Sequence, residues 1–370
     1  MFRVRYQVSS QPIGMFETET RLKRLVHGIL LFTALLAPDD SAGQVWGIQE
    51  WTSIGSEAED RLRLEQLLSD VSTAGFLLRT PSILLSQPDS AREPQSRWTL
   101  MLLPPEFRSV WNSDLPVSMN DGTLWAGAGW SARLTTGVRL RVGRTTLILA
   151  PEGIHQANAP FQFYPFPKNL DPPRKIHADP FHPLPESIDK PVQFGDETLD
   201  EIRPGQSSLT VRLGPVSLGA ATENAWWGPG IRNGIIMSNH ASGVPHLFLR
   251  TSHPIETTAG TLEGRWILGR LEESDYFDLD PSNDERSLSG LVLTLQPSFD
   301  RGLTLGLARV VYAPMTEKKG WTSAAFDVFR SVGRPNSGEE DSPTASARDQ
   351  IFALFGRWVF SPAGFEVYGE

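Results

Sequence analysis

Two adjacent tryptophans, Trp226 and Trp227, open a tight turn at 226–230 (WWGPG). Aromatic rings bind the apolar faces of sugar rings, and the preceding Glu223 and Asn224 can exchange hydrogen bonds with hydroxyl groups. The same residues suit an architectural turn, with one ring packed inward and the other at a membrane interface. The pattern therefore predicts either a carbohydrate contact or a structural corner.

A second group of aromatic residues lies in the proline-rich stretch 151–206, which includes Tyr164 and Phe166. Prolines reduce the entropy that a loop loses on ordering, and rigid aromatic side chains provide contact area at small cost. We expect this stretch to be one long loop that forms the main ligand surface. A self-packed plug or lid without a ligand is the alternative.

Two stretches carry side chains that could bind a metal ion. Residues 177–182 hold two histidines and one aspartate, but Pro180 interrupts them and a fourth ligand is missing. Residues 275–289 resemble a calcium loop, yet Asn283 stands where the EF-hand requires glycine and Ser289 where it requires glutamate. We therefore expect no metal site and no cofactor.

Catalytic chemistry has little support in the residue patterns. The absence of cysteine excludes cysteine nucleophiles and thiolate metal sites, and no Gly-x-Ser-x-Gly nucleophile elbow is present. Glu263 and Arg265 share one face of an alternating stretch, but glycosidase chemistry requires a second carboxylate and none stands out. We expect a protein that is not an enzyme; a soluble periplasmic carbohydrate-active enzyme is one alternative.

Composition narrows the class of protein further. The chain has 370 residues, 39% of them hydrophobic, and a formal charge of −9. The acidic balance argues against nucleic-acid partners, because neutralising phosphates requires clustered Lys and Arg. No apolar run reaches the roughly 18–20 residues of a membrane-spanning helix. That test does not detect strands that cross a membrane, so the periodicity of the sequence must decide the fold class.

The N-terminus has the order of a secretory signal. Basic residues at 21–24 precede the apolar run 25–37, and small residues follow it. We therefore expect residues 1–43 to be a signal peptide. Residues 1–14 form a polar stretch before this signal, which indicates that translation starts at Met15.

One helix is predicted in the N-terminal helical segment 44–95. Ser56 and Glu59 fit a capping box, and apolar residues then recur at helical spacing until a glycine. This pattern predicts an amphipathic helix over about residues 57–74. Its apolar positions are Leu64, Leu67, Leu68 and Val71.

Most of the remaining sequence alternates between apolar and polar residues, which is the period of a β-strand. The alternation predicts strands at 121–135 and 138–150, joined by a tight turn at Thr136-Gly137. A second pair turns at Gly214-Pro215. Further strands are predicted at 258–270, 289–296 and 303–312, and in a last pair that turns at 361–364.

Short turns alternate with long loops at 151–206, 271–287 and 313–349, as in bacterial outer-membrane barrels. We therefore expect an all-β fold in which residues 96–370 form an antiparallel outer-membrane β-barrel, and not a soluble sandwich with one wet face.

Two irregularities accompany this prediction. If the first two long loops lie on the same side of a membrane, only one of the candidate strands at 233–239 and 246–251 can be a full crossing. In addition, Arg309 lies on the apolar face of the strand at 303–312. A charge that faces lipid is tolerated only near a membrane interface.

Residues 223–230 (ENAWWGPG) and 236–247 (IMSNHASGVPHL) together resemble the capsule assembly protein Wzi family. That family has a Trp-Trp-Gly-Pro-Gly turn here, followed by Leu-Ser-Asn-Asn-Ala and a proline. His240 stands where the second Asn is usual, so an amide-specific role does not carry over to this position. A looser resemblance extends over 120–127, 260–271 and 357–370.

The resemblance implies an outer-membrane barrel of about eighteen strands in a Gram-negative bacterium, with a short helical N-terminal part. Such proteins bind capsular polysaccharide in a lectin-like way and help to attach or assemble it at the cell surface. The expected partners are therefore surface polysaccharide, outer-membrane lipid and polysaccharide export machinery. The expected ligand contacts are Trp226, Trp227, Asn224, Arg232, Asn239, Tyr164 and Phe166.

Length and charge add two expectations. About eighteen strands of 9–11 residues with their loops require more chain than follows the signal, so we expect a barrel truncated at the C-terminus. Because the chain is acidic, an acidic polysaccharide would require a local basic lining such as Arg232, Arg250 and Arg265. A general diffusion channel with the same fold is the other alternative.

Overall fold

The computed structural model describes one compact unit within residues 45–94 and 98–370. The predicted signal peptide and the predicted contacts Tyr164 and Phe166 lie outside the described residues. No helix in the described part is both long enough and apolar enough to cross a membrane. The described residues are 45–48, 52–68, 77–84, 98–113, 116–161, 194–195, 197–272, 285–315, 321–330 and 349–370.

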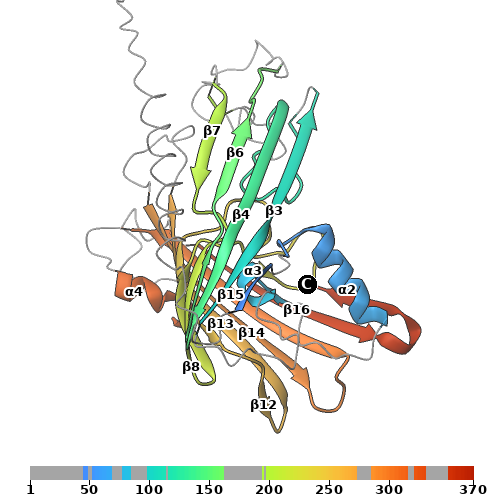
Figure 1. Cartoon of the computed structure of the whole chain (residues 1–370). Coiled ribbons are helices and arrows are strands. Elements are labelled where there is room, and N and C mark those ends of the chain that lie inside the picture. Colours follow the sequence, from blue (N-terminus) through green and yellow to red (C-terminus); the bar gives the residue numbers. More distant parts are fainter. Residues whose placement is uncertain are drawn as a thin grey trace, which may run out of the picture. The chain divides into compact units, whose positions relative to one another are not determined.

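A sheet of 15 strands dominates the unit, which confirms the predicted all-β class (Figure 1). The strand order is β1-β3-β4-β5-β8-β9-β11-β13-β14-β15-β16-β17. In addition, β6 pairs with β4, β7 pairs with β6, and β12 pairs with β13. The bounds are β1 (Val45–Ile48), β3 (Trp98–Asn112), β4 (Gly129–Val142), β5 (Thr145–Leu149), β6 (Glu152–Gln156), β7 (Leu199–Arg203), β8 (Ser208–Leu213), β9 (Val216–Ala221), β11 (His246–Thr251), β12 (Ile255–Thr257), β13 (Gly260–Glu272), β14 (Glu285–Pro297), β15 (Leu303–Pro314), β16 (Asp349–Phe360) and β17 (Phe365–Gly369).

The ladders are antiparallel, except that β1 pairs with β3 in parallel. Among the described residues no ladder joins β1 to β17, so closure of the sheet into a barrel stays a prediction. A small ladder of β2 with β10 and several short helices accompany the sheet. Their bounds are α2 (Glu57–Leu68), β2 (Leu78–Arg79), α3 (Pro81–Leu84), β10 (Trp226–Trp227), α4 (Trp321–Ala325), η1 (Asp327–Phe329) and η3 (Ser361–Ala363).

The two faces of the sheet have opposite surroundings. On β11, His246 and Phe248 are buried, whereas Leu247 and Leu249 are 59% and 41% exposed. We call the side of Phe248 the inner face and the side of Leu247 the outer face. The hydrophobic core joins Phe248 to side chains of β2 and β10. The core therefore lies on the inner face, between the sheet and the small ladder.

Several predicted turns and strands are confirmed. Gly214 turns β8 into β9 with a φ of +66°, a conformation that glycine adopts without strain. η3 turns β16 into β17 at the predicted 361–364. Between β9 and β13 the strand order contains β11 alone, and residues 233–239 form no strand. One of the two candidate stretches therefore forms no strand, as the prediction required.

The predicted turn at Thr136-Gly137 is wrong. β4 continues through both residues to Val142, and the chain turns at Gly143, whose φ is +56°. A Cβ on Gly137 would lie 2.0 Å from the carbonyl oxygen of Leu149. Glycine at this position therefore allows the neighbouring strand to approach closely, because it has no Cβ. The predicted strand at 121–135 is also shorter than expected, because β4 begins only at Gly129.

Among the strands that were not predicted, β3, β6 and β7 are the most informative. β3 runs across Pro104-Pro105, where its register with β4 shifts between Leu103 and Glu106. Proline has no N–H for the ladder, so the strand accommodates it at an irregularity. β6 and β7 lie at the two ends of the stretch 151–206 and pair with each other. The prediction of one uninterrupted loop over that stretch is therefore wrong.

The helix begins where the capping box placed it. The backbone N–H of Glu59 donates to Oγ of Ser56 at 3.2 Å, and the N–H of Gly55 donates to Oε2 of Glu59 at 2.7 Å. Both bonds satisfy N–H groups at the helix start. α2 is described to Leu68, and the predicted end at 74 lies outside the described residues.

The buried side of α2 differs from the apolar side. Its buried residues are Glu59, Arg63 and Gln66, while Leu64 and Leu68 are 57% and 81% exposed. The spacing of leucines thus predicted the helix correctly, but it did not predict which face of the helix is buried against the rest of the protein. The polar residues face inward because their partners are buried charged groups of the sheet interior.

Candidate functional site

The tryptophan turn is buried against the inner face. Trp226 and Trp227 are 0% and 1% exposed, and β10 pairs with β2 so that Trp226 lies opposite Arg79. The Arg79 guanidinium lies 4.6 Å from the centre of the Trp226 ring. On β14, a Cβ on Gly290 would lie 2.8 Å from Cη2 of Trp227. Glycine there makes room for the indole.

This burial agrees with the architectural interpretation of the turn. Neither ring presents a face to solvent, so stacking on a sugar would require the interior to open. The polysaccharide contact predicted for Trp226 and Trp227 stays a prediction. What the structure establishes is that both rings fill the space between the sheet and β2.

Two predicted amide contacts hold chain segments together. Asn224 is buried, accepts a hydrogen bond from Nε2 of Gln206 at 2.8 Å and donates to the carbonyl oxygen of Ala241 at 2.6 Å. Asn239 is buried and donates from Nδ2 to the carbonyl oxygens of Ile54 and Asn120 at 3.1 and 2.8 Å. The amide NH2 groups of both side chains therefore donate hydrogen bonds within the protein.

Arg232 has the opposite environment. Its side chain is exposed, and its backbone carbonyl accepts a hydrogen bond from the side chain of Asn120. Of the five predicted contacts that the structure describes, Arg232 is the one open to a ligand in solution. It lies outside the strands and is therefore not part of the strand ladders that align Arg250 with Arg265.

A charged cluster surrounds Glu223 beneath the turn. Its Oε1 accepts a hydrogen bond from Oγ of Ser82 at 2.7 Å, and its Oε2 accepts one from the N–H of Ser82 at 2.9 Å. Nη2 of Arg265 lies 3.4 Å from Oε1 and 2.8 Å from Nε2 of His246. Nδ1 of His246 lies 2.6 Å from the carbonyl oxygen of Val244. His246 is therefore a neutral imidazole that donates to Val244 and accepts from Arg265.

Arginines form a lateral row on the inner face. The ladder registers place Arg212 of β8 opposite Ser217 of β9, Ser217 opposite Arg250 of β11, and Arg250 opposite Arg265 of β13. We call Arg212, Arg250 and Arg265 the arginine row. Glu263 lies on the same face of β13, two positions from Arg265. Like charges directly opposite each other on a sheet repel, as Arg250 and Arg265 do, and Glu223 offsets the charge of Arg265 within the protein.

Exposure changes along the arginine row. Arg212 is exposed, Arg250 is half-buried and Arg265 is 1% exposed. Nε of Arg250, and Nε and Nη1 of Arg265, are buried and have no hydrogen-bond partner within the described part of the chain. Buried N–H donors favour an acceptor strongly. The row therefore has donors for an anion and an exposed end by which an anion could approach.

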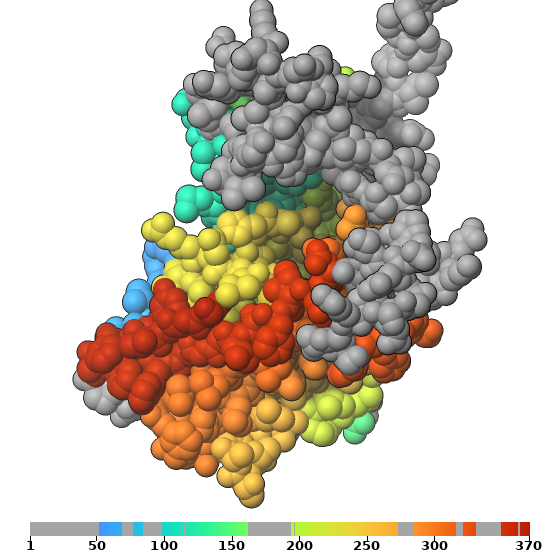
Figure 2. Space-filling model, turned by 180° about the vertical axis from the view of Figure 1, so that it is seen from behind, coloured from blue at the N-terminus to red at the C-terminus, as the bar shows by residue number. Residues whose placement is uncertain are grey.

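A second ionic network joins the two ends of the described chain. Glu366 of β17 accepts hydrogen bonds from Nε of Arg63 in α2 at 2.8 Å and from Nε of Arg357 in β16 at 2.7 Å. The terminal Glu370 side chain accepts from the N–H groups of Gly230 and Ile235 at 3.0 and 2.7 Å. Figure 2 shows that the chain after the tryptophan turn, in yellow, lies against β16 and β17, in red.

Burial shifts the ionisation of the groups beneath α2. Glu59 and Arg79 form an ion pair with 3.3 Å between Oε1 and Nη1. Burial raises the pKa of Glu59, and the nearby Arg79 opposes this shift. Burial, together with the charges of Arg63 and Arg357, lowers the pKa of Arg79 to about 10. The pair holds α2 against the tryptophan turn.

The arginine row could not be assembled from the sequence. Alternation along 208–213 does place Arg212 on the polar side of its strand, and the same pattern places Arg265 on the polar side of β13. Neighbouring positions, however, depend on the order and register of four strands, which alternation does not provide.

Comparison with known proteins adds no family to these observations. No family model matches the chain, and neither the curated proteins nor the solved structures include a match.

Proposed function

We propose that this protein is an outer-membrane β-barrel of a Gram-negative bacterium that binds surface polysaccharide and helps to attach or assemble it at the cell surface. Its role is lectin-like and involves no catalytic step. The two-faced strands support the membrane part, because such strands alternate between apolar residues toward lipid and polar residues toward the interior. On β8 and β9 the outward residues Leu209, Leu213 and Leu218 are 44%, 46% and 43% exposed.

The arginine row is the observation that carries the polysaccharide part of the proposal. A chain with a formal charge of −9 repels polyanions, so an acidic glycan must meet locally concentrated positive charge. The row supplies the exposed guanidinium of Arg212 and the half-buried guanidinium of Arg250, and such groups match carboxylates with paired N–H donors. We therefore propose an acidic polysaccharide that carries uronate or similar anionic groups.

The filled inner face favours this role over a general diffusion channel. Trp226 and Trp227, together with α2 and its ion pairs, occupy space that an open pore would need. In planar bilayers we expect little current from the purified protein. A steady, porin-like conductance would support the channel instead.

The test is binding of the purified protein to polygalacturonate, with neutral dextran as the reference glycan. Arg212→Gln with Arg250→Gln removes two charges from the row, and we expect roughly tenfold or more weaker binding of polygalacturonate. Added NaCl should weaken binding by the unsubstituted protein, because screening acts on charged contacts.

Arg301→Gln is the matched control, since Arg301 is an exposed arginine in the turn between β14 and β15. It removes the same type of charge outside the row and should leave the affinity unchanged. Equal affinity for dextran and polygalacturonate, or an equal loss in the control, would contradict the proposed site.

A further inference from the structure

A non-strand segment is fixed to the outer face of the sheet. Trp266 of β13 donates from Nε1 to the carbonyl oxygen of Ala325 at 3.2 Å, and Oγ of Ser289 of β14 donates to the same oxygen at 2.9 Å. Arg309 of β15 donates from Nη1 to the carbonyl oxygens of Val328 and Arg330 at 3.0 and 2.6 Å. We call α4 with η1, residues 321–329, the outer segment.

These contacts explain the irregular Arg309. In a hydrocarbon environment every polar group must find a partner within the protein. The outer segment supplies carbonyl acceptors for the arginine, the serine and the indole N–H that the outer face would otherwise present. Its own outward side chains are aromatic: Trp321, Phe326 and Phe329 are 40%, 57% and 55% exposed. The outer segment therefore continues the apolar character of the outer face.

Beside the outer segment the outer face is hollowed. A groove of about 560 Å³ runs across β5, β8, β9, β11 and β13, within the size range of small-molecule sites. The ladder registers place four leucines and one alanine in a lateral row across these strands. In order, the row is Leu147, Leu209, Ala220, Leu247 and Leu268.

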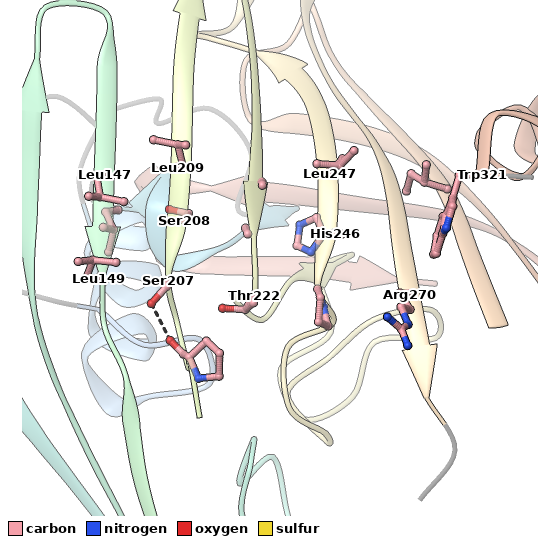
Figure 3. A pocket seen from close by; sticks show the side chains of 16 residues that line it. Leu147, Leu149, Ser207, Ser208, Leu209, Thr222, His246, Leu247, Arg270 and Trp321 are labelled. Atoms are coloured by element: carbon pink, nitrogen blue, oxygen red, sulfur yellow. Dashed lines mark hydrogen bonds between the residues drawn. The ribbon is translucent and has the colours of Figure 1, made fainter. Parts of the chain in front are cut away.

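Ala220 explains the hollow, because its methyl group stands between leucines that extend further from the sheet. Trp321 of the outer segment lines the groove as well. Figure 3 shows Leu147, Leu209 and Leu247 on β5, β8 and β11, with β9 between the last two strands and Trp321 beyond them. The groove is thus built from side chains of both the sheet and the outer segment.

The charged groups that line the groove favour an uncharged ligand. Arg270 is the one Asp, Glu, Lys or Arg among the described residues that line the groove. Nη2 of Arg270 lies 2.9 Å from Oε1 of Glu272 and also pairs with Glu285. Two carboxylates thus balance one guanidinium, so the groove has no free positive charge for a phosphate or carboxylate. Its lining matches the hydrocarbon part of a lipid.

We propose that this groove binds a single lipid acyl chain, lying across the Leu147–Leu268 row and against Trp321. The inference rests on the proposed function, because it takes the outer face to be the side that meets lipid. It goes further in naming one preferred position for a chain on that face. Filling the hollow with hydrocarbon gives contact that a flat stretch of the sheet cannot provide.

The experiment uses phosphatidylcholine with a photoactivatable diazirine near the end of one acyl chain. Purified protein is irradiated with this lipid in dodecylmaltoside micelles and in vesicles, and the labelled peptides are identified by mass spectrometry. We expect label to concentrate on residues 208–221 and 321–330, several-fold above residues 303–314 of β15.

Ala220→Trp fills the hollow and should reduce labelling of those peptides to the level of β15. Leu305→Trp places the same ring on the outer face of β15, where Leu305 is 46% exposed, and should leave the labelling pattern unchanged. Circular dichroism confirms that both variants retain the β-structure. Uniform labelling of the outer face, or labelling that Ala220→Trp does not reduce, would overturn the proposed groove.

Membrane fractionation of the full chain distinguishes this failure from failure of the proposed function. Selective labelling in micelles of a protein that fractionates away from membranes would support the groove and refute the outer-membrane role. Uniform labelling of a protein recovered in the outer membrane would refute the groove alone.

Discussion

The inner and outer faces come from the same strands, yet they place opposite chemistry in opposite surroundings. Inward residues of β11 and β13 such as His246 and Arg265 are polar and buried, and Arg265 bonds to His246 and pairs with Glu223. Glu223 in turn accepts a hydrogen bond from Ser82 of α3. Outward residues such as Leu247 and Leu249 are apolar and exposed. Exposed apolar side chains in this number are unusual for a protein in water, and the proposed membrane location would give the outer face an apolar environment.

The largest expected effect is loss of an inner-face ring. Trp227→Ala removes a 1%-exposed indole from the core and should lower the free energy of unfolding by about 3–5 kcal/mol. Trp358→Ala on β16, where the ring is 41% exposed, should cost much less. Urea unfolding in detergent measures both. Equal losses would mean that the two faces are packed alike.

The next effect tests the outer face. Leu247→Arg places a charge on the 59%-exposed outward side of β11. In lipid vesicles the substitution should destabilise the protein by about 2–4 kcal/mol if this position lies near the bilayer centre, because a guanidinium is poorly solvated there. A change confined to a few tenths of a kcal/mol in vesicles would place Leu247 in water.

A smaller effect is expected at the network that joins α2 to β17. Glu366→Gln leaves Arg63 and Arg357 without their carboxylate and should cost roughly 1.5–3 kcal/mol. Hydrogen exchange of α2 should quicken. Glu57→Gln is the matched control, because the Arg61–Glu57 pair is 71% and 81% exposed and such pairs contribute about 0–1 kcal/mol. Equal exchange in both variants would exclude the network as an anchor of α2.

The smallest effect concerns pH. Burial raises the pKa of Glu59 above its usual 4.5, so the folded protein holds this proton more tightly than the unfolded chain. The contribution to stability is fully present below about pH 4.5 and is lost as the pH rises through the folded-state pKa. Glu59→Gln should flatten this part of the stability profile. A profile identical to that of the unsubstituted protein would contradict the assignment.

The sequence predicted local features of this comparison better than long-range ones. Alternation correctly gave β8 and β9, and the capping box gave the start of α2. The prediction of a turn at Gly137 was wrong, because glycine is required there by the close approach of the β5 backbone. The pairing of β4 with β5 cannot be read from the residues next to Gly137. The buried side of α2 was missed for the same reason: Arg63 and Gln66 face inward to reach Glu366 and Arg357 of the last strands.

The candidate site shows the same division. The tryptophan turn was visible as a motif, but its burial depends on β2 and Gly290, which lie far from it in the sequence. The arginines were visible one at a time, and the row they form depends on strand register. Local patterns thus identified the residues, whereas their neighbours required the three-dimensional fold.

Single-cysteine scanning tests the central claim most directly, because the chain contains no cysteine of its own. Spin labels placed at 208–213 and 246–251 in vesicles report access to oxygen, which enriches in lipid, and to a water-soluble nickel chelate. We predict a period of two, with oxygen access highest at Leu247→Cys, Leu249→Cys and Leu209→Cys. Nickel access that follows no alternation, or that is highest at these three positions, would contradict the two-faced sheet.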